Sequence, residues 1–314
     1  MEIGNLIIRS PIAKALAIIG DVWTFRILQE IFLGHHRFET FINNTGASRA
    51  TLSKRLQSLI NHNILEKRVY QQTPVRYEYH LTKKGAALFE FFQVSWQWER
   101  KWSTDENQPI PKHSACGNPM DIVLSCNHCQ QEIEAASLNY RPGPGIDTAP
   151  IMNFGEVRRA KKSKEDKQRN LSAGEVLSDR WTPFVLATAL FGLHRFDEMQ
   201  QQLSIATNIL SDRLKLLVES GLLEKLAYQS NPVRYEYKLT DKGKDFYKMA
   251  ITLNQWGEQW LLEGEESALI LYHHCSNEPI KTKLSCRHCQ APITPPATQA
   301  TTTNAATTEI LEPS

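Results

Sequence analysis

Residues 65–82 read LEKRVYQQTPVRYEYHLT, and residues 223–240 read LEKLAYQSNPVRYEYKLT. Thirteen of the eighteen aligned positions are identical, at an offset of 158 residues (from 65 to 223). The same offset relates pairs on either side of these stretches, such as Trp98 and Trp256. A period this long is a whole domain, so the sequence predicts two tandem copies of one domain rather than a solenoid.

Each copy changes its apolar spacing from helical to alternating. Apolar residues step by three and four before residue 65, which is typical of helices, and alternate at period two around the turn at Gln72–Pro74, which is typical of a hairpin. Helices are expected at residues 11–20, 24–33, 37–44, 49–62 and 82–102. This order predicts a winged helix-turn-helix, and hence a chain that is mainly α with small β elements.

Composition shifts divide the chain further. The linker is rich in Pro and Gly and ends in a charged run, Glu156 to Asn170, that is a solvated segment or a strap for phosphate. The Thr/Ala/Pro-rich tail is expected to be disordered. The predicted segments are winged-helix domain 1 (10–105), a cysteine-containing ribbon-like appendix (106–135), the linker (136–170), winged-helix domain 2 (171–263), a second appendix (264–293) and the tail (294–314).

The composition excludes several classes of protein. The 314 residues include 36 basic and 34 acidic side chains, and 41% are apolar, which describes a globular protein with enough material for a core. No apolar run is long enough to cross a membrane, and residues 1–10 do not read as a signal peptide, so we expect a cytoplasmic protein without a membrane partner. Nucleotide-binding and hydrolase motifs are absent from the sequence, and we expect no enzymatic activity.

In a helix-turn-helix, the second helix presents its first turns to base edges in the major groove, while the wing reaches the backbone or the minor groove. The second copy has Asp212 where the first has Lys54, and Thr207 where the first has Arg49, so it should hold phosphate less strongly. Arg55 and Arg213 could equally pair with acidic neighbours. The candidate DNA-binding residues are Ser48, Arg49, Thr51, Ser53, Lys54, Arg55 and Arg76 in the first copy and Thr207, Asn208, Ser211, Arg213, Lys215 and Arg234 in the second.

The six cysteines all fall in the two appendices. A C-x2-C pair with two upstream ligands has the spacing of a structural zinc ribbon. His128 and His288, inside the C-x2-C pairs, are additional candidates. A metal-free ribbon and a redox-active thiol pair are the alternatives. The candidate ligands are His113, Cys116, Cys126 and Cys129 in the first appendix and His273, Cys275, Cys286 and Cys289 in the second.

Both copies resemble the HxlR-type winged helix-turn-helix family of bacterial transcriptional regulators. The resemblance rests on IGDVWTFRILQEIFLGHHRF, LSKRLQSLINHNILEKRVY and PVRYEYHLTKKG in the first copy, and on SDRWTPFVLATALFGLHRF, LSDRLKLLVESGLLEKLAY and PVRYEYKLTDKG in the second. It implies a repressor or activator that binds double-stranded DNA as a dimer, with an unknown small-molecule effector as a further partner. Some members sense oxidants through a cysteine that precedes the first helix, but Ser10 stands at that place here.

Two domains in one chain predict an intramolecular pseudo-dimer, with a homodimer as the alternative. A flexible linker of forty residues would span about 35 Å, close to the ~34 Å between adjacent major-groove half-sites. Trp96, Trp98 and Trp102, with Trp256 and Trp260, are candidates for the interface between the copies, or else fill the two separate cores. Two alternative functions are compatible with the same fold. In one, the second copy is a dimerisation or ligand-binding scaffold. In the other, the cysteines form a metal or thiol sensor.

Overall fold

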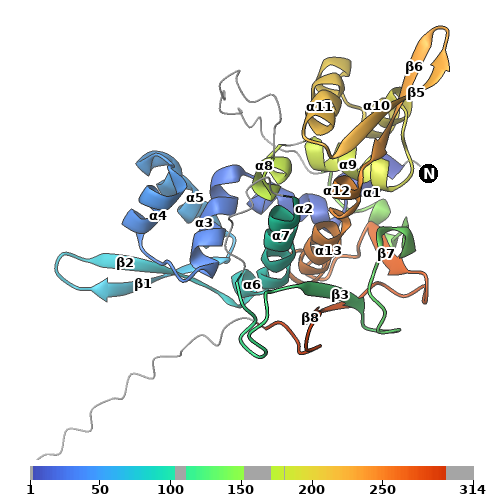
Figure 1. The fold of residues 1–314 in the computed structure, drawn as a ribbon. Helices are drawn as coiled ribbons and strands as arrows, with labels where there is room; N and C mark the ends of the chain where they lie inside the picture. The colour runs from blue at the N-terminus through green and yellow to red at the C-terminus, as the bar shows by residue number, and fades with distance from the viewer. Residues whose placement is uncertain (1–2, 103–110, 152–170, 180, 295–314) are drawn as a thin grey trace, which may run out of the picture.

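The structure is a computed structural model that describes residues 3–102, 111–151, 171–179 and 181–294 (Figure 1). The charged run 156–170 and the tail 295–314 lie outside these residues. The first repeat and its appendix contain α1 (Ile3–Ile8), α2 (Pro11–Ile19), α3 (Val22–Phe32), α4 (Phe38–Thr45), α5 (Arg49–Asn61), β1 (Leu65–Gln71), β2 (Arg76–Leu81), α6 (Lys83–Ala86), α7 (Phe89–Trp102) and β3 (Ile122–Cys126). Residues 135–146 add η1 (Ala135–Ser137), β4 (Leu138–Pro142) and η2 (Pro144–Ile146).

The second repeat follows the same order. It contains α8 (Ala173–Leu177), α9 (Thr182–Leu190), α10 (Phe196–Leu203), α11 (Thr207–Glu219), β5 (Leu223–Ser230), β6 (Val233–Leu239), α12 (Asp241–Lys244), α13 (Tyr247–Leu261), β7 (Leu269–His273) and β8 (Thr282–Cys286). Both repeats are therefore winged helix-turn-helix domains, and the chain is mainly helical with small sheets, which confirms the expected fold class. Among the described residues, no helix is long and apolar enough to span a membrane.

The helix ends follow from local capping. Ser10 begins α2 by accepting a hydrogen bond from the backbone N–H of Ala13, and its hydroxyl donates to the carbonyl of Ile7. Asp21 caps α3 in the same way, so this helix begins at Val22, two residues before the predicted Thr24. The long helix predicted for residues 82–102 is two helices, α6 and α7, separated at Ala87 and Leu88.

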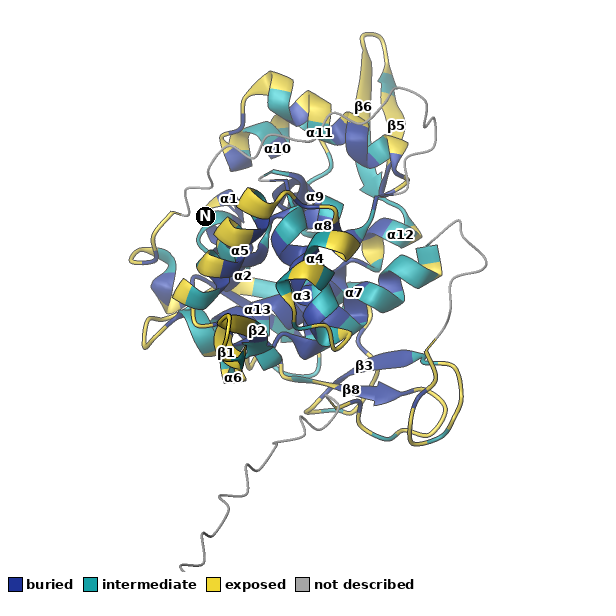
Figure 2. Cartoon of the chain, turned by 90° about the vertical axis from the view of Figure 1, so that its left-hand side faces the viewer, coloured by how far each residue is buried: buried dark blue, intermediate teal, exposed yellow. Residues whose placement is uncertain are grey.

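The two wings are antiparallel hairpins that project from the body. β1 pairs with β2 from Leu65–Leu81 outward, and β5 pairs with β6 from Leu223–Leu239 outward. Figures 1 and 2 show the two hairpins leaving the helical body in different directions, with exposed tips. A two-stranded hairpin is not stable alone, so each wing depends on the helices packed at its base.

The two repeats meet along their terminal helices, α7 and α13, which lie side by side in the centre of the molecule (Figure 1). The leading helices are exchanged: α2 packs on α13 of the second repeat, and α8 packs on α3 and α7 of the first. We call this interface of α2, α7, α8 and α13 the seam. A Cβ atom at Gly257 would lie 2.6 Å from the carbonyl oxygen of Pro11, so glycine permits the close approach of α13 and α2. The buried apolar side chains form one cluster through both repeats.

Two further contacts tie the N-terminal segment to the second repeat. Helix α1, which the sequence analysis left out of domain 1, packs on α9 and α10, where the Gly4 N–H donates to the Gln202 side chain at 3.1 Å. Lys14 of α2, with a nearly buried side chain, forms an ion pair with Glu265.

The strands after each winged helix depart from the sequence-based expectation. The two appendices were expected to be separate ribbon-like units, but β3 of the first appendix pairs with β8 of the second, from Ile122–Cys286 to Cys126–Thr282. Residues 138–142, assigned to a flexible linker, form β4 and pair with β7. The flexible-coil estimate of linker reach therefore fails for this part of the chain. We call the two appendices together the ribbon module.

Candidate nucleic-acid interface and metal centres

Helix α5 is the recognition helix of the first repeat, and its start is fixed by a turn and a cap. Gly46 adopts a left-handed conformation (φ +71°) at the end of α4, which turns the chain toward α5. Ser48 caps α5 by accepting from the Thr51 N–H at 3.2 Å, and its hydroxyl donates to the Thr51 hydroxyl at 2.9 Å. Ser53 and Lys54 are exposed in the next turn. The first turns of α5 thus present short hydroxyl groups and cations on one accessible surface.

Arg49 lies at the outer start of α5 and is already paired with an acid. Its guanidinium donates to both carboxylate oxygens of Glu39 on α4, at 2.9 and 2.7 Å, and both side chains are about two-thirds exposed. The hydrogen bonds and charge of Glu39 raise the pKa of Arg49 further above its usual value. Because the pair is exposed, it should contribute little to stability.

Arg55 has a different environment from Arg49. Its Nε lies 3.1 Å from the carboxylate of Asp21, the residue that caps α3, and the Asp21 side chain is only 10% exposed. Arg55 therefore joins the recognition helix to the start of α3. Of the two roles left open for it by the sequence, the structure contains the pairing with an acidic neighbour.

The second recognition helix, α11, repeats this arrangement with changes. Ala206 occupies the cap position and supplies no side-chain hydrogen bond, while Thr207 accepts from Gln200 at 2.8 Å. Asn208 and Ser211 are exposed, and Lys215 lies 3.8 Å from Glu219 in an exposed pair.

The partly buried arginine of this helix again pairs with an acid that precedes a helix. Arg213 donates to Asp179 at 2.6 Å, and these side chains are 19% and 5% exposed. Asp179 also accepts from the N–H groups of Trp181 and Thr182. The acids Asp21 and Asp179 were missed by the sequence analysis, although their place just before a helix in both repeats was a cap signal.

The charge of the two recognition helices differs. Helix α5 carries Arg49, Lys54 and Arg55 and no acid, whereas α11 carries two bases, Arg213 and Lys215, and two acids, Asp212 and Glu219. The first recognition helix is therefore the more cationic of the two.

The wings carry the remaining candidate cations. Arg76 and Arg234 are exposed near the tips of the first and second wings. Tyr79 is buried at the base of the first wing, but Tyr77 and Tyr235 remain 43% and 40% exposed.

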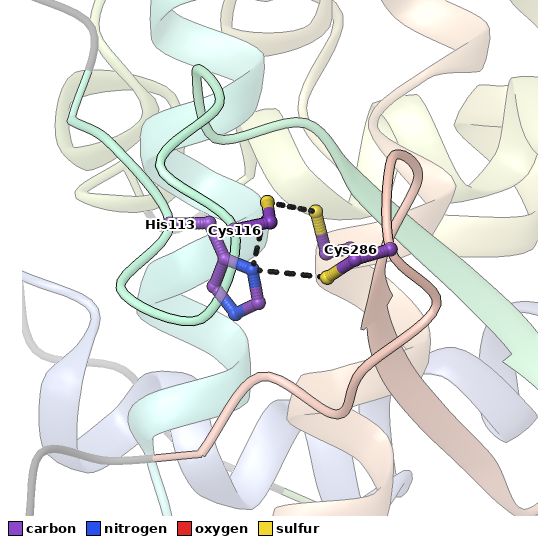
Figure 3. Close-up of side chains that lie close together, drawn as sticks. His113, Cys116 and Cys286 are labelled. Atoms are coloured by element: carbon purple, nitrogen blue, oxygen red, sulfur yellow. Dashed lines mark hydrogen bonds between the residues drawn. The ribbon is translucent and has the colours of Figure 1, made fainter.

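The cysteine and histidine residues gather into two clusters, but not in the groups that the sequence suggested. Cluster A contains His113, Cys116, Cys286 and Cys289, and cluster B contains Cys126, Cys129, His273 and Cys275. Each cluster thus takes two side chains from each appendix, whereas the sequence analysis grouped the four residues within one appendix. Figure 3 shows a loop of the first appendix and the C-x2-C turn of the second approaching each other in cluster A. The crossed pairing of β3 with β8 causes this exchange.

The sulfur–sulfur separations in both clusters, and the nitrogen–sulfur separations in cluster A, fit a tetrahedral ion. Four ligands around zinc, with Zn–S bonds of about 2.3 Å and Zn–N bonds of about 2.0 Å, place sulfur atoms about 3.8 Å apart and sulfur about 3.5 Å from nitrogen. In cluster A, Cys116 Sγ lies 3.9 Å from Cys286 Sγ, and His113 Nδ1 lies 3.5 and 3.4 Å from the sulfurs of Cys116 and Cys289.

Cluster B has similar dimensions, apart from one nitrogen–sulfur pair that is about 0.5 Å closer than this geometry gives. Cys126 Sγ lies 3.7 Å from Cys275 Sγ, and His273 Nδ1 lies 3.5 Å from Cys129 Sγ and 3.0 Å from Cys275 Sγ. His128 and His288, the additional candidates, belong to neither cluster and are exposed.

The thiols within the clusters differ in acidity. The Asn118 backbone N–H, followed by the hydrogen bond with His113, lowers the pKa of Cys116 to about 6. Burial, followed by hydrogen bonds with the neighbouring thiols of Cys129 and Cys126, raises the pKa of Cys275 to about 11. Burial also lowers the pKa of His273, which favours the neutral imidazole that metals bind.

Two helix-turn-helix units, each with a wing and an accessible recognition helix, define a DNA-binding protein of the winged-helix class. Comparison with known proteins gives the family. The model of the HxlR-like helix-turn-helix family matches residues 18–107 and 176–265, more than half of the chain. This chain belongs to that family and is a helix-turn-helix transcriptional regulator.

Individual relatives match one repeat's length of this chain. An uncharacterised HTH-type transcriptional regulator of Mycobacterium tuberculosis is 39% identical over 120 residues, covering 38% of this chain and 76% of the relative. The HTH-type transcriptional regulator YodB of Bacillus subtilis is 33% identical over 95 residues, covering 30% and 85%. The solved structure of reduced YodB shares 27% identity, with a TM-score of 0.28, and covers 30% of this chain and 93% of that one.

Proposed function

We propose that one molecule of this chain binds one DNA site as a pseudo-dimer and thereby regulates transcription. The observation that carries the proposal is the seam, which joins two winged-helix domains into one body through exchanged helices. A pair of recognition helices held in one body can enter successive major grooves, as the two subunits of a dimeric regulator do. The tandem repeat supplies both helices from a single chain.

The proposed contacts divide by exposure. Ser48, Arg49, Thr51, Ser53 and Lys54 on α5 are assigned to base edges and adjacent phosphates, and Arg76 on the first wing is assigned to the backbone. Arg55 and Arg213 are assigned to positioning, because each pairs with a nearly buried aspartate. In the second repeat, the proposed contacts are Thr207, Asn208, Ser211 and Lys215 on α11 and Arg234 on the second wing.

The recognition helices differ in sequence, so the DNA site should have two unequal halves without a palindrome. Arg49 and Lys54 correspond to Thr207 and Asp212 at the repeat offset. The first half-site should contribute most of the electrostatic attraction, since α11 carries as many acids as bases.

Selection of bound fragments from a random duplex pool, followed by footprinting and sedimentation, tests this proposal. We expect a monomer that protects one asymmetric site of two helical turns. An obligate dimer with a symmetric footprint would refute the pseudo-dimer and favour pairing between two chains.

A second candidate keeps the fold but gives the second repeat a scaffold role. The acids Asp212 and Glu219 on α11 favour it. Replacing Asn208, Lys215 and Arg234 together by alanine separates the two, because these exposed residues do not support the fold. A loss of DNA affinity would exclude a pure scaffold, and unchanged affinity would support one.

The remaining parts of the proposal follow from the regulator family. We assign the protein a non-enzymatic role in the cytoplasm, where its DNA target lies.

An apolar cavity between α2, α9 and α13 has a volume of about 50 Å³. This is smaller than the ~150 Å³ cavity that holds benzene, so an effector of ordinary size would have to bind elsewhere or enlarge the cavity.

We also propose that clusters A and B hold zinc. Three thiolates and one imidazole are the donor set of a structural zinc site, and the separations of the ligand atoms fit a tetrahedron. Metal analysis of protein purified without chelator tests this directly. We expect two zinc ions per chain, and fewer than one ion after exposure to zinc would contradict the proposal.

A further inference from the structure

The two clusters connect parts of the chain that are remote in sequence. Cluster A joins the His113–Cys116 loop of the first appendix to the C-x2-C turn of the second, and cluster B joins the first C-x2-C turn to His273 and Cys275. The arrangement is reciprocal, because each appendix gives its loop to one cluster and its C-x2-C turn to the other. A metal ion in either cluster would therefore have two ligands from each repeat.

The ribbon module is attached to α7 and α13, the two terminal helices of the seam, by equivalent residues. Gln97 of α7 donates to the Ile122 carbonyl at 3.0 Å and accepts from the Ile122 N–H at 2.8 Å. Gln255 of α13, at the repeat offset from Gln97, donates to the Ile280 carbonyl at 2.8 Å and accepts from the Thr282 hydroxyl at 2.8 Å. The module thus holds one terminal helix of each DNA-binding domain.

Other contacts at the module also join the two repeats. Arg287 of the second appendix pairs with Asp121 at 3.1 Å and with both carboxylate oxygens of Glu132, at 3.0 and 2.8 Å, in the first. The Tyr247 hydroxyl of α13 donates to the Ile133 carbonyl of the first appendix. Side-chain contacts therefore join the two repeats at the module in addition to the two clusters.

We infer that metal ions in clusters A and B bridge the two repeats, so that metal occupancy maintains the relative placement of the two DNA-binding domains. The inference rests on the proposed zinc binding and adds that each ion is shared between the repeats. Binding of a metal to sites absent from the unfolded chain is coupled to folding. Here the folded unit is the shared β3–β8 sheet, and loss of either ion should loosen both appendices at once.

Paired substitutions test the sharing in the full-length chain, with zinc content as the readout. Cys116→Ser with Cys289→Ser removes two ligands of cluster A, so this variant should retain one zinc ion per chain. Cys116→Ser with Cys129→Ser removes one ligand from each cluster, so it should retain none. If the ligands were grouped within each appendix, the two results would be exchanged, and that exchange would overturn the inference.

Matched controls come from the same C-x2-C turns. His128→Asn and His288→Asn change exposed histidines outside the clusters and should leave two ions bound. The single variants Cys116→Ser and Cys129→Ser should each lose one ion under either grouping, so if the double variants fail to fold, hydrogen exchange in Cys116→Ser decides between the groupings. If the natural chain binds no zinc, the proposed cofactor is contradicted. If it binds two ions but the double variants show the exchanged pattern, only the sharing of each ion between the repeats is contradicted.

Hydrogen exchange tests the bridging role independently of zinc content. In Cys116→Ser, amide exchange should rise at least tenfold in both β3 and β8, and also rise in α7 and α13, where Gln97 and Gln255 attach the module. Exchange in α5 and α11, which lie outside the module, should change little. Faster exchange confined to the first appendix, or unchanged exchange in α7 and α13 after metal loss, would overturn the bridging role.

Discussion

The indole N–H of Trp98 on α7 donates a hydrogen bond to the backbone carbonyl of Lys242, across the seam, at 3.0 Å. The equivalent residues of the other repeat form the reciprocal bond, from Trp256 to the Lys84 carbonyl at 2.9 Å. The two tryptophans are 4% and 3% exposed, and each ring also lies near the ammonium group of the same lysine. The seam therefore has approximate two-fold symmetry in its polar bonds as well as in its helices.

The indole bonds should contribute measurably to stability. Trp98→Phe keeps an aromatic ring but removes the donor of the partly buried hydrogen bond to the Lys242 carbonyl, which should cost about 0.5–1.5 kcal/mol of unfolding free energy. Trp256→Phe should cost a similar amount for the same reason. Trp96→Phe is the control, because Trp96 packs on Phe32 and Phe92 of its own repeat. Equal losses for all three variants in urea unfolding would contradict a special role of the seam.

Arg55 and Arg213 should support the fold before they support DNA binding. Arg55→Ala leaves Asp21 nearly buried without its cation, which should destabilise the protein by about 1–3 kcal/mol. Arg213→Ala should cost more, because Arg213 and Asp179 are the more buried pair. Thermal unfolding measures both. If stability is unchanged while DNA affinity is lost, Arg55 and Arg213 instead contact DNA directly.

Lys54 should show the opposite behaviour. Lys54→Ala removes an exposed cation from α5, so unfolding free energy should not change, while specific DNA binding should weaken by about 1–3 kcal/mol if Lys54 reads a base. Fluorescence anisotropy with the selected duplex measures this affinity. If binding is unchanged, Lys54 does not contact the DNA.

In the free protein, the ion pair with Glu39 should compete with DNA for the Arg49 side chain. Glu39→Gln removes the negative charge beside Arg49 in this exposed pair, so DNA affinity should rise about two- to fivefold. Arg49→Ala is the matched variant and should weaken binding. The hypothesis fails if Glu39→Gln binds DNA no better than the natural chain at low salt.

Arg76 and Arg234 should contribute through phosphate. Alanine at either position should weaken binding to all duplexes alike and reduce the slope of log affinity against log salt by about 1. Titrations at several salt concentrations, with the selected and an unrelated duplex, give both quantities. A loss restricted to one DNA sequence would indicate base reading instead.

The periodicity and capping in the sequence were enough to predict most of each winged-helix domain. Ser10, Ser48 and Thr82 begin helices in the structure as their local sequence indicates, because a cap acts within three residues along the chain. The wings were predicted from the alternation of apolar and polar residues on both sides of a turn, which is also a local pattern in the sequence. The repeat also indicated two domains, since identical sequences at a fixed offset form the same fold.

The tertiary structure alone decided which partners these local elements take. The sequence places Cys126 and Cys129 three residues apart, but it does not state that their cluster is completed by His273 and Cys275 of the other repeat. It contains Arg55 and Arg213, but not the burial that pairs them with Asp21 and Asp179. Because the two repeats are similar, both present equivalent surfaces. Each segment can therefore pack either on its own domain or on the other domain. That choice depends on burial and packing summed over the whole seam, which local spacing does not encode.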